Sequence, residues 1–393
     1  MLYFDNAATT ALHPKALEAM MPFLTSEYAN PSSVYSSARK VRSAIDDARQ
    51  IVANVINADF SEIFFTSGGT EANNWAIKGI LGCEKHGHII TSQVEHHGVL
   101  NVFKYLEKQG FEVTYLPVDE EGFIHPSFLA ESIRKETRLV SLIFANNEIG
   151  TITQIKELAE ICNKYNVPFH TDAVQAVGHI PIDVKELGVD MLTLSAHKFN
   201  GPKGVGALYI KRGTKIDPIL FGGAHERGRR AGTENATGII GLGAALKVVT
   251  DNFSINVARV TKLRDRLINE ILTNIPHTSL NGATGTNRLP GNVNISFDFI
   301  EGESLLLHLD MNGCCASTGS ACSSGTLDPS HVLMAIGLNH EKANGALRFS
   351  IGLNNTDDDI TELLKILAPA VERLRNLSPL YDDFLTNNKE VKI

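Results

Sequence analysis

The sequence predicts an α/β fold with two parts: a large domain built on a mostly parallel sheet flanked by helices, and a smaller α+β domain. Between about residues 60 and 250, short β-rich runs alternate with longer amphipathic segments, a pattern typical of strands joined by helical crossovers. Such crossovers place helices on both faces of the sheet. After about residue 250 the order of strands and helices becomes mixed, which indicates the second domain.

The elements of the large domain are predicted from hydrophobic period and β propensity. Strands are expected at 62–66, 88–91, 112–116, 139–144, 168–171, 191–195 and 207–210. Helices are expected between them at 70–81, 97–109, 155–165 and 174–178. Ligands of such a sheet bind at the carboxyl ends of its strands, so functional residues should follow those ends.

The smaller domain begins with a long helix at 257–275, where Leu263, Leu267 and Ile271 recur every four residues. Strands are expected at 293–296 and 347–351, and further helices at 304–311 and 357–374. The predicted division assigns residues 15–255 to the large domain and residues 1–14 and 256–393 to the small one.

Composition narrows the classes of function. The 393 residues are 43% hydrophobic and carry a net charge of −8. A chain of this length can bury a sizeable core, and its acidic balance argues against binding to nucleic acid or to an anionic membrane. Arg227, Arg229 and Arg230 form a local basic cluster that could bind an anion.

Targeting signals and cysteine spacing predict the compartment. The first five residues lack the basic and apolar regions of a signal peptide. The most apolar stretch, 238–249, is too short to span a bilayer. The five cysteines, at positions 83, 162, 314, 315 and 322, form no disulfide framework. We therefore expect a soluble cytoplasmic protein with free thiols.

The stretch 195–204 is the most informative in the chain. A predicted strand ends at Ser195 and is followed by His197, Lys198 and a turn rich in Gly and Pro. Most lysines lie on the surface, but a lysine at a strand end among polar neighbours can form a Schiff base with an aldehyde cofactor. Burial and cationic neighbours would lower its pKa, so that it could also act as a base.

Two further segments are expected at the same sheet edge. Asp172 ends the preceding predicted strand and could pair with a protonated pyridine nitrogen, although alone it could equally cap a helix. Gln175 could donate a hydrogen bond to a ring oxygen. The segment Thr-Ser-Gly-Gly-Thr-Glu at 66–71 joins a strand to a helix, where backbone N–H groups can hold a phosphate. Gly69 allows close approach there and Thr70 adds a hydroxyl.

These segments belong to an ordered set of motifs that runs nearly end to end. The set comprises the Asp172 and Lys198 segments together with Tyr3–Thr10, Asn30–Ser33, Phe65–Asn74, Val94–His96, Asn146–Gly150 and Arg229–Thr233. The chain thus resembles the class V aminotransferase branch of the fold-type I enzymes that depend on pyridoxal 5'-phosphate (PLP). Within that branch it resembles the cysteine desulfurases of the NifS/IscS type.

The resemblance implies roles around the cofactor ring. Lys198 would carry PLP as a Schiff base, Asp172 would face the pyridine nitrogen, and His96 would stack on the ring and assist proton transfer. Asn147 and Gln175 would lie near the ring oxygen and the substrate.

The resemblance also implies how the phosphate and the substrate are held. The phosphate would be bound by Gly69, Thr70, Ser195 and His197, and by Thr233 from the other subunit, which implies a homodimer. Arg348 would clamp the substrate carboxylate through its planar guanidinium.

Cys322 indicates which of the reactions known for this fold the chain would catalyse. It lies in a run of Ser, Gly, Ala and Thr that cannot pack a core and should form a mobile loop. The run matches the persulfide-forming loop of the family, so the thiolate of Cys322 would attack the sulfur of L-cysteine and alanine would leave. An iron–sulfur scaffold protein or another sulfur carrier would then accept the sulfur. Cys314 and Cys315, on a predicted strand, are expected to fill the core, with a redox role or a sulfur relay to Cys322 as the alternative.

The sequence leaves several other functions possible. A selenocysteine lyase or an aminotransferase would use the same fold, but neither strictly needs a loop thiol. A sulfur-transfer scaffold without activity would not need Lys198, Asp172 and His96. A dinucleotide-dependent dehydrogenase is a third class, but the glycines at 241–246 lack the third glycine and the preceding strand of a dinucleotide site. A metal site built from His96, His97 and His170 is poorly supported, because these residues do not have the spacing of metal ligands.

Overall fold

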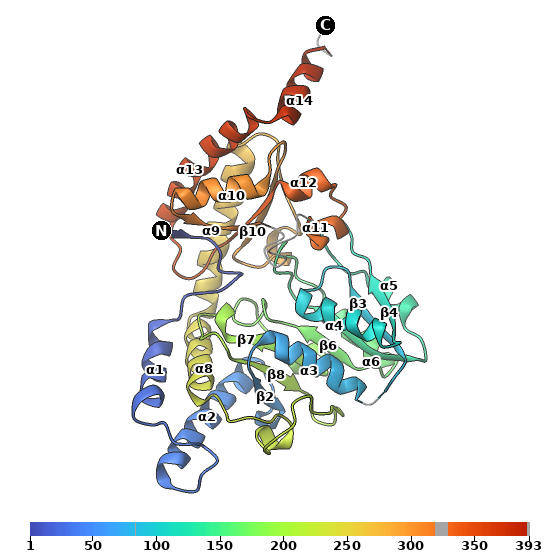
Figure 1. The fold of residues 1–393 in the computed structure, drawn as a ribbon, viewed down its shortest axis with the longest axis vertical. Coiled ribbons are helices and arrows are strands. Elements are labelled where there is room, and N and C mark those ends of the chain that lie inside the picture. Colours follow the sequence, from blue (N-terminus) through green and yellow to red (C-terminus); the bar gives the residue numbers. More distant parts are fainter. Residues whose placement is uncertain (83, 319–328, 391–393) are drawn as a thin grey trace.

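The computed structural model describes the chain except residues 83, 319–328 and 391–393. A sheet of seven strands organises the larger part, with the order β2-β8-β7-β6-β5-β3-β4 (Figure 1). The strands are β2 (Ile63–Thr66), β3 (His88–Ser92), β4 (Glu112–Leu116), β5 (Thr137–Ile143), β6 (Phe169–Asp172), β7 (Met191–Ser195) and β8 (Gly206–Ile210). Only β8 runs against its neighbours. The predicted, mostly parallel sheet is therefore confirmed.

Each of the seven predicted strands lies on one observed strand, with bounds that differ by at most two residues. Every residue of β3, β6, β7 and β8 is buried. Strands covered by helices on both faces lack the polar alternation of a half-exposed strand, which is why these segments stand out in the sequence as short apolar runs.

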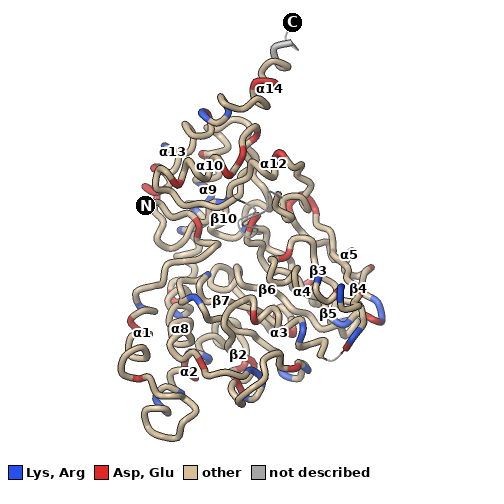
Figure 2. Tube along the Cα trace, in the orientation of Figure 1, with Lys and Arg blue, Asp and Glu red and all other residues tan. Residues whose placement is uncertain are grey.

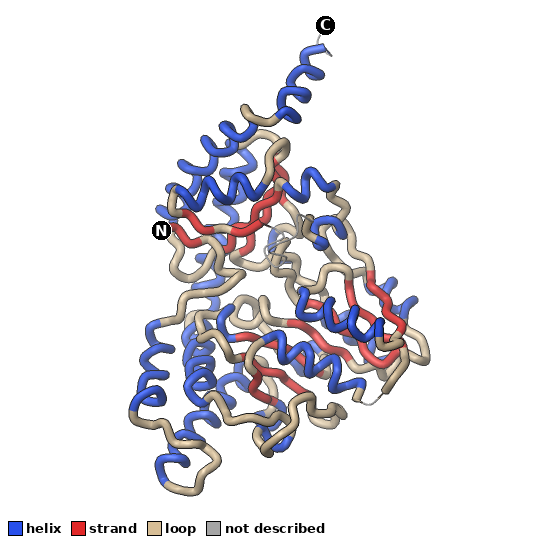
Figure 3. The backbone as a smooth tube through the Cα atoms, viewed as in Figure 1, coloured by secondary structure: helices blue, strands red, loops and turns tan. Residues whose placement is uncertain are grey.

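Helices surround this sheet on both faces (Figure 3). They are α1 (Pro14–Thr25), α2 (Ser36–Val55), α3 (Gly69–Leu81), α4 (His97–Lys108), α5 (Pro126–Ser132), α6 (Ile155–Lys164), α7 (Val184–Leu187) and α8 (Ala236–Asp251). The predictions at 70–81, 97–109 and 155–165 correspond to α3, α4 and α6. The structure adds α1, α2, α5, α7 and α8 to the predicted elements.

The predicted helix at 174–178 is wrong, because this segment forms a turn. The N–H groups of Ala176 and Val177 both bond to Ala173 O, at 2.9 and 3.0 Å. Gly178 then takes a φ of +82°, a left-handed conformation that glycine adopts without steric cost and that ends the helical path.

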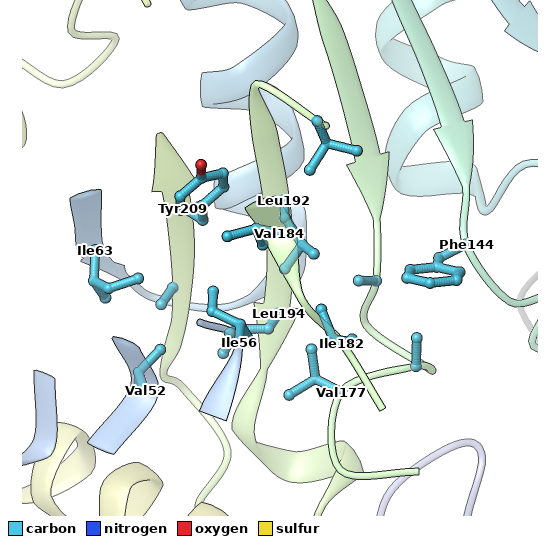
Figure 4. Close-up of a cluster of buried hydrophobic side chains, with 14 of the residues drawn as sticks. Val52, Ile56, Ile63, Phe144, Val177, Ile182, Val184, Leu192, Leu194 and Tyr209 are labelled. Carbon is cyan, nitrogen blue, oxygen red and sulfur yellow. The ribbon is translucent and has the colours of Figure 1, made fainter. Parts of the chain in front are cut away.

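Separate hydrophobic clusters cover the two faces of the sheet. On β7, Leu192 and Leu194 belong to one cluster, whereas Met191 belongs to the other. Figure 4 shows Leu192, Leu194 and Tyr209 of the first cluster, which also contains Val52 and Ile56. The opposite face packs against α3 and α4 and includes Trp75 and Phe103. Alternating side chains thus fix both helical layers on the same strands.

A second group of elements lies beyond α8 in the chain. Its strands are β9 (Thr278–Leu280), β10 (Asn292–Phe297), β12 (Ser317–Thr318) and β13 (Ala346–Ser350), in the antiparallel order β12-β13-β10-β9. A two-stranded parallel sheet pairs β1 (Leu2–Tyr3) with β11 (Cys314–Cys315). The helices are α9 (Phe253–Asn274), α10 (Gly302–Met311), α11 (His331–Ala335), α12 (His340–Asn344), α13 (Asp357–Arg375) and α14 (Pro379–Glu390).

This group has its own hydrophobic core. The core includes Leu263, Leu267, Phe349 and, from the N-terminal segment, Phe4. The predicted helices at 257–275, 304–311 and 357–374 and the strands at 293–296 and 347–351 all overlap observed elements of the same type.

Among the described residues, no individual helix has the length and hydrophobicity needed to cross a membrane. Only α8 and α9 together pass that test by length and composition, and they are bent by 76° relative to each other.

Two leucines of α9 provide a test of the second core. Leu267 is fully buried and Leu272, one and a half turns on, is 40% exposed. We expect Leu267→Ala to lower the free energy of unfolding by about 2–5 kcal/mol, because it leaves a cavity. Leu272→Ala should change it by only about 0.5 kcal/mol. Urea unfolding of both variants checks this, and equal midpoints would contradict the packing described.

Candidate active site

One cavity of about 300 Å³ lies at the carboxyl ends of β6 and β7. Its lining residues come from both sheets and from the N-terminal segment: Ala7, Ala8, Gly69, Thr70, Asn73, His96, Ile143, Asn147, Asp172, Val174, Gln175, Ser195, His197, Lys198 and Arg348. All the site residues predicted from the sequence are among them except Cys322 and Thr233. Residues from Ala7 to Arg348, 341 positions apart in the chain, therefore meet in one place.

A larger and more open cavity, of about 510 Å³, lies at the opposite edge of the sheet. It is bordered by Thr137, Pro168 and Asp190, where β5, β6 and β7 begin. No predicted site residue borders it. The carboxyl edge is where an open α/β sheet binds its ligands, so the smaller cavity is the candidate site.

Lys198 ends a short 3-10 turn that continues from β7. Its Nζ donates hydrogen bonds to the carbonyl oxygens of Ala7 and Ala8, each at 2.7 Å. Gln175 Nε2 also donates to Ala7 O, at 2.9 Å. The N-terminal segment thus forms one wall of the cavity and holds the amine in place, a role that sequence reasoning missed.

Asp172 ends β6 and is 3% exposed. Its Oδ2 accepts a hydrogen bond from Asn73 Nδ2 at 2.7 Å, and its Oδ1 accepts one from Val174 N at 3.0 Å. These two donors fix the orientation of a buried carboxylate. Asn73 was also missed as a site residue; the available signal was its position one turn into the helix that follows the glycine pair.

The turn at 67–70 leads directly into α3, whose first residue is Gly69. A Cβ at Gly69 would come within 2.7 Å of Val174 Cγ2, so only glycine lets the turn pack this closely. Thr70 and Ser195 border the same end of the cavity. Because the first N–H groups of a helix lack intrahelical partners, this end suits an anion.

His197 and His96 are both shifted toward the neutral form. Burial, aided by the charges of Lys198 and Lys203, lowers the pKa of His197 to about 4. Burial also lowers the pKa of His96, and Lys198 adds to this while Asp172 opposes it. His96 caps α4 and its Nδ1 accepts a hydrogen bond from Gly98 N at 2.9 Å. The neutral ring therefore carries its proton on Nε2.

Arg348 extends from β13 into the cavity and is 3% exposed. Its Nη1 donates to Asn147 O at 3.0 Å and its Nη2 donates to Asp5 Oδ1 at 2.9 Å. Its Nε is buried and has no hydrogen-bond partner among the described residues. A guanidinium held from two sides, with its Nε–H unused, is suited to bind a carboxylate.

Two predicted residues are not among the described residues that line this cavity. Cys322 lies outside the described residues, as does Cys83. On either side of the segment that contains Cys322, Ser317 pairs with Arg348 across β12 and β13, and Ser330 Oγ donates to Glu148. Thr233 is exposed, and its hydroxyl has no hydrogen bond to any described residue.

The predicted core position is confirmed for Cys314 but not for Cys315. Cys162 is buried in α6, and Cys314, on β11, is also buried, while Cys315 is half-buried. Burial raises the pKa of Cys314 to about 12, so this thiol stays protonated. In the described part of the chain, no three His, Cys, Asp or Glu side chains are arranged to hold a metal ion.

The residues of the cavity fit PLP. Lys198 offers an amine, Asp172 offers a carboxylate with fixed orientation, and the start of α3 offers an anion site. Two buried polar atoms of lining residues, Asn73 Oδ1 and Arg348 Nε, lack partners among the described residues. Buried polar groups are normally satisfied, so the cavity has unused hydrogen-bonding capacity for a polar ligand.

Comparisons with known proteins agree with this geometry. The family described as Aminotransferase class-V matches residues 2–363. A cysteine desulfurase IscS from Clostridium botulinum is 53% identical over 392 residues, which is 99% of each chain. A cysteine desulfurase IscS from Methanosarcina thermophila is 54% identical over 381 residues, covering 96% of this chain and 94% of that one.

Solved structures show the same relationship. A NifS-like protein superimposes with a TM-score of 0.89 at 37% identity, covering 95% of this chain and all (100%) of the other. A structure described as SspA in complex with cysteine has a TM-score of 0.80 at 36% identity, covering 91% and 100%. The chain therefore belongs to the class V aminotransferase family and, within it, to the cysteine desulfurases of the NifS/IscS type.

Proposed function

We propose that the protein is a PLP-dependent cysteine desulfurase that converts L-cysteine to L-alanine and retains the sulfur as a persulfide on Cys322. The observation that carries the proposal is the convergence of Lys198, Asp172, His96 and Arg348 on one cavity. The curated relatives with this activity match the chain over nearly its whole length.

PLP would be held at three points by residues of this chain. Lys198 would bind the aldehyde carbon, Asp172 would hold the pyridine nitrogen protonated, and the turn at 67–70 with Ser195 and His197 would bind the phosphate. When bound, PLP supplies an electron sink for the charge that forms at the substrate Cα.

The chain's own residues would orient the substrate and move its protons. Arg348 would bind the carboxylate of L-cysteine, with Asn147 beside it. Lys198 Nζ would remove the Cα proton, and it lies beside the two carbonyl oxygens that orient it. Neutral His96, with its proton on Nε2, would stack on the ring and serve as a further proton carrier, while Gln175 would bond to the ring oxygen.

The sulfur step balances without an external oxidant. The thiolate of Cys322 attacks the sulfur of L-cysteine, an S–S bond forms and the C–S bond breaks. The electron pair of the C–S bond stays with carbon, which takes up a proton. The sum is L-cysteine plus the Cys322 thiol, giving L-alanine plus the Cys322 persulfide.

Assembly, domain division and partners are part of the same proposal. We propose a homodimer in which Thr233 reaches the phosphate in the cavity of the other subunit. An iron–sulfur scaffold protein or another sulfur carrier would accept the sulfur, in the cytoplasm, where free thiols stay reduced. We also propose a large domain at 15–255 and a small domain at 1–14 and 256–393, a division supported by the separate cores around Leu194 and Leu267.

Lys198→Ala tests the cavity. We expect alanine formation to fall by about 10²- to 10⁴-fold, the range for loss of a positioned proton-transfer group, and the absorbance of the lysine-bound cofactor to disappear. Lys203→Ala is the matched control, since Lys203 is exposed five residues further on. Retained activity in the Lys198 variant would show that this cavity is not the active site.

Cys322→Ala tests the sulfur step. With L-cysteine and a reductant, and after normalising to bound PLP, we expect alanine from the wild type and almost none from the variant. Cys315→Ala, which alters a half-buried thiol on β11, should keep the wild-type rate. Equal alanine from wild type and Cys322→Ala would exclude the persulfide role and favour a lyase that does not use this thiol.

A further inference from the structure

The segment 225–235, here called the arm, joins the loop after β8 to the start of α8. Three charged residues of the arm, spaced four apart, are Glu226, Arg230 and Glu234. Each forms an ion pair with α2 or α3 of the same chain. The arm is therefore held in one conformation by its own subunit.

The first of these contacts fixes the beginning of the arm. Glu226 and Arg49 form a two-point pair, with both N–O distances at 2.8 Å, and both side chains are almost fully buried. Glu226 Oε2 also accepts a hydrogen bond from Phe65 N of the edge strand β2 at 3.0 Å. Glu226 and Arg227 have φ values of +46° and +57°, which are costly for residues other than glycine and persist only where surrounding contacts enforce them.

The second contact connects the arm to the turn proposed to bind phosphate. Arg230 Nε donates to Glu71 Oε1 at 2.8 Å and its Nη2 donates to Glu71 Oε2 at 2.9 Å. Glu71 directly follows Thr70 and also accepts a hydrogen bond from Ser67 N at 2.7 Å. Burial alone would raise the pKa of Glu71, but the hydrogen bonds from Arg230 and Ser67 outweigh it and lower the pKa. The carboxylate is thus charged and shared between the arm and the turn.

The third contact fixes the far end. Glu234 is bound by Arg42, with one N–O distance of 2.8 Å, and its side chain is 4% exposed. Thr233 lies between Arg230 and Glu234, so both sides of it are anchored. The basic cluster noted in the sequence is accordingly engaged within the chain: Arg230 binds Glu71, and Arg227 donates to Ile63 O at 2.6 Å.

Although its neighbours are anchored, Thr233 itself is exposed and does not border the cavity of its own chain. Large apolar side chains nearby are also exposed: Phe221, in the loop leading to the arm, is 85% exposed, and Val34 is 87% exposed. The segment of Val34 contacts the arm through Ser32 Oγ and His225 Nδ1, 3.5 Å apart. In Figure 1 the arm is the yellow-green loop beside β2. A preformed, outward-facing hydroxyl next to apolar surface fits a second copy of this chain.

We propose that the Arg230–Glu71 ion pair positions the arm for the other subunit, so that Arg230 acts as a positioning residue for the cofactor phosphate in the partner's cavity. The inference rests on the proposed dimer with shared cavities. Its physical basis is that a two-point guanidinium–carboxylate contact fixes direction as well as distance. Glu71 also accepts a hydrogen bond from Ser67 N, in the phosphate turn of its own chain. The Arg230–Glu71 pair therefore links the phosphate turn of one subunit's cavity to the arm that reaches the partner's cavity.

Mixed dimers separate this role from a local one. Lys198→Ala in one subunit leaves a single working cavity. In the first arrangement, Arg230→Gln and Lys198→Ala share one chain and the other chain is wild type, so the working cavity receives the altered arm. In the second arrangement, one chain carries Arg230→Gln and the other carries Lys198→Ala. The working cavity is then in the Arg230→Gln chain and receives the normal arm of the Lys198→Ala chain. The readouts are the Kd of the apo dimer for PLP and kcat at saturating PLP.

We expect the Kd for PLP to rise by about tenfold in the first arrangement, the effect of losing one charge-assisted hydrogen bond, and to change little in the second. The kcat at saturating PLP should recover. Arg229→Gln, which alters the neighbouring exposed arginine, should leave both arrangements unchanged. An equally large rise in the Kd for PLP in the second arrangement, or no rise in either arrangement, overturns the inference.

Thr233→Ala in the first arrangement distinguishes the two proposals. If Thr233→Ala weakens PLP binding and Arg230→Gln does not, only the role of Arg230 is wrong. If Thr233→Ala has no effect, or if light scattering shows monomers in the wild type, the shared cavity itself is wrong and the inference fails with it.

Discussion

The common direction of the strands in the seven-stranded sheet decides where the chemistry of this protein lies. Asp172 ends β6, and the 3-10 turn that carries Lys198 follows β7, the neighbouring parallel strand. Parallel strands bring their carboxyl ends to one edge, so two residues 26 positions apart in the sequence must border the same cavity.

The second sheet and the N-terminal segment close the cavity from the other side. Arg348 comes from β13 and is fixed by Asp5 and by the carbonyl of Asn147. A buried guanidinium is tolerated only where such partners satisfy it. The first residues of the chain therefore serve both parts: Phe4 packs into the second core, and the carbonyls of Ala7 and Ala8 hold Lys198. Lys198 and Arg348 are thus positioned by the same short segment.

Burial controls the charge state of the other groups around the cavity. It keeps His96 and His197 neutral, so these rings can exchange or donate protons without adding fixed positive charge. Glu95, which is fully buried and accepts hydrogen bonds from Ser92 Oγ and Ile143 N, has its pKa raised to about 8 by burial. In Figure 2 acidic and basic residues are interspersed along the trace, so the selectivity of the cavity arises from these local groups and not from a general field of one sign.

The sequence by itself determined the strands of the seven-stranded sheet, the helices α3, α4, α6, α9, α10 and α13, and most of the residues that line the cavity, because hydrophobic period and motif spacing are local properties. It determined the positions of Asp172 and Lys198 at strand ends and the glycine turn that leads into α3. Only the tertiary structure decided that Asn73 holds Asp172, that Ala7 and Ala8 hold Lys198, that residues 174–178 form a turn, and that Arg230 joins Glu71. These contacts depend on how distant surfaces pack: Lys198 and Ala7 are 191 residues apart, and Arg230 and Glu71 are 159 apart. No local pattern encodes such pairs.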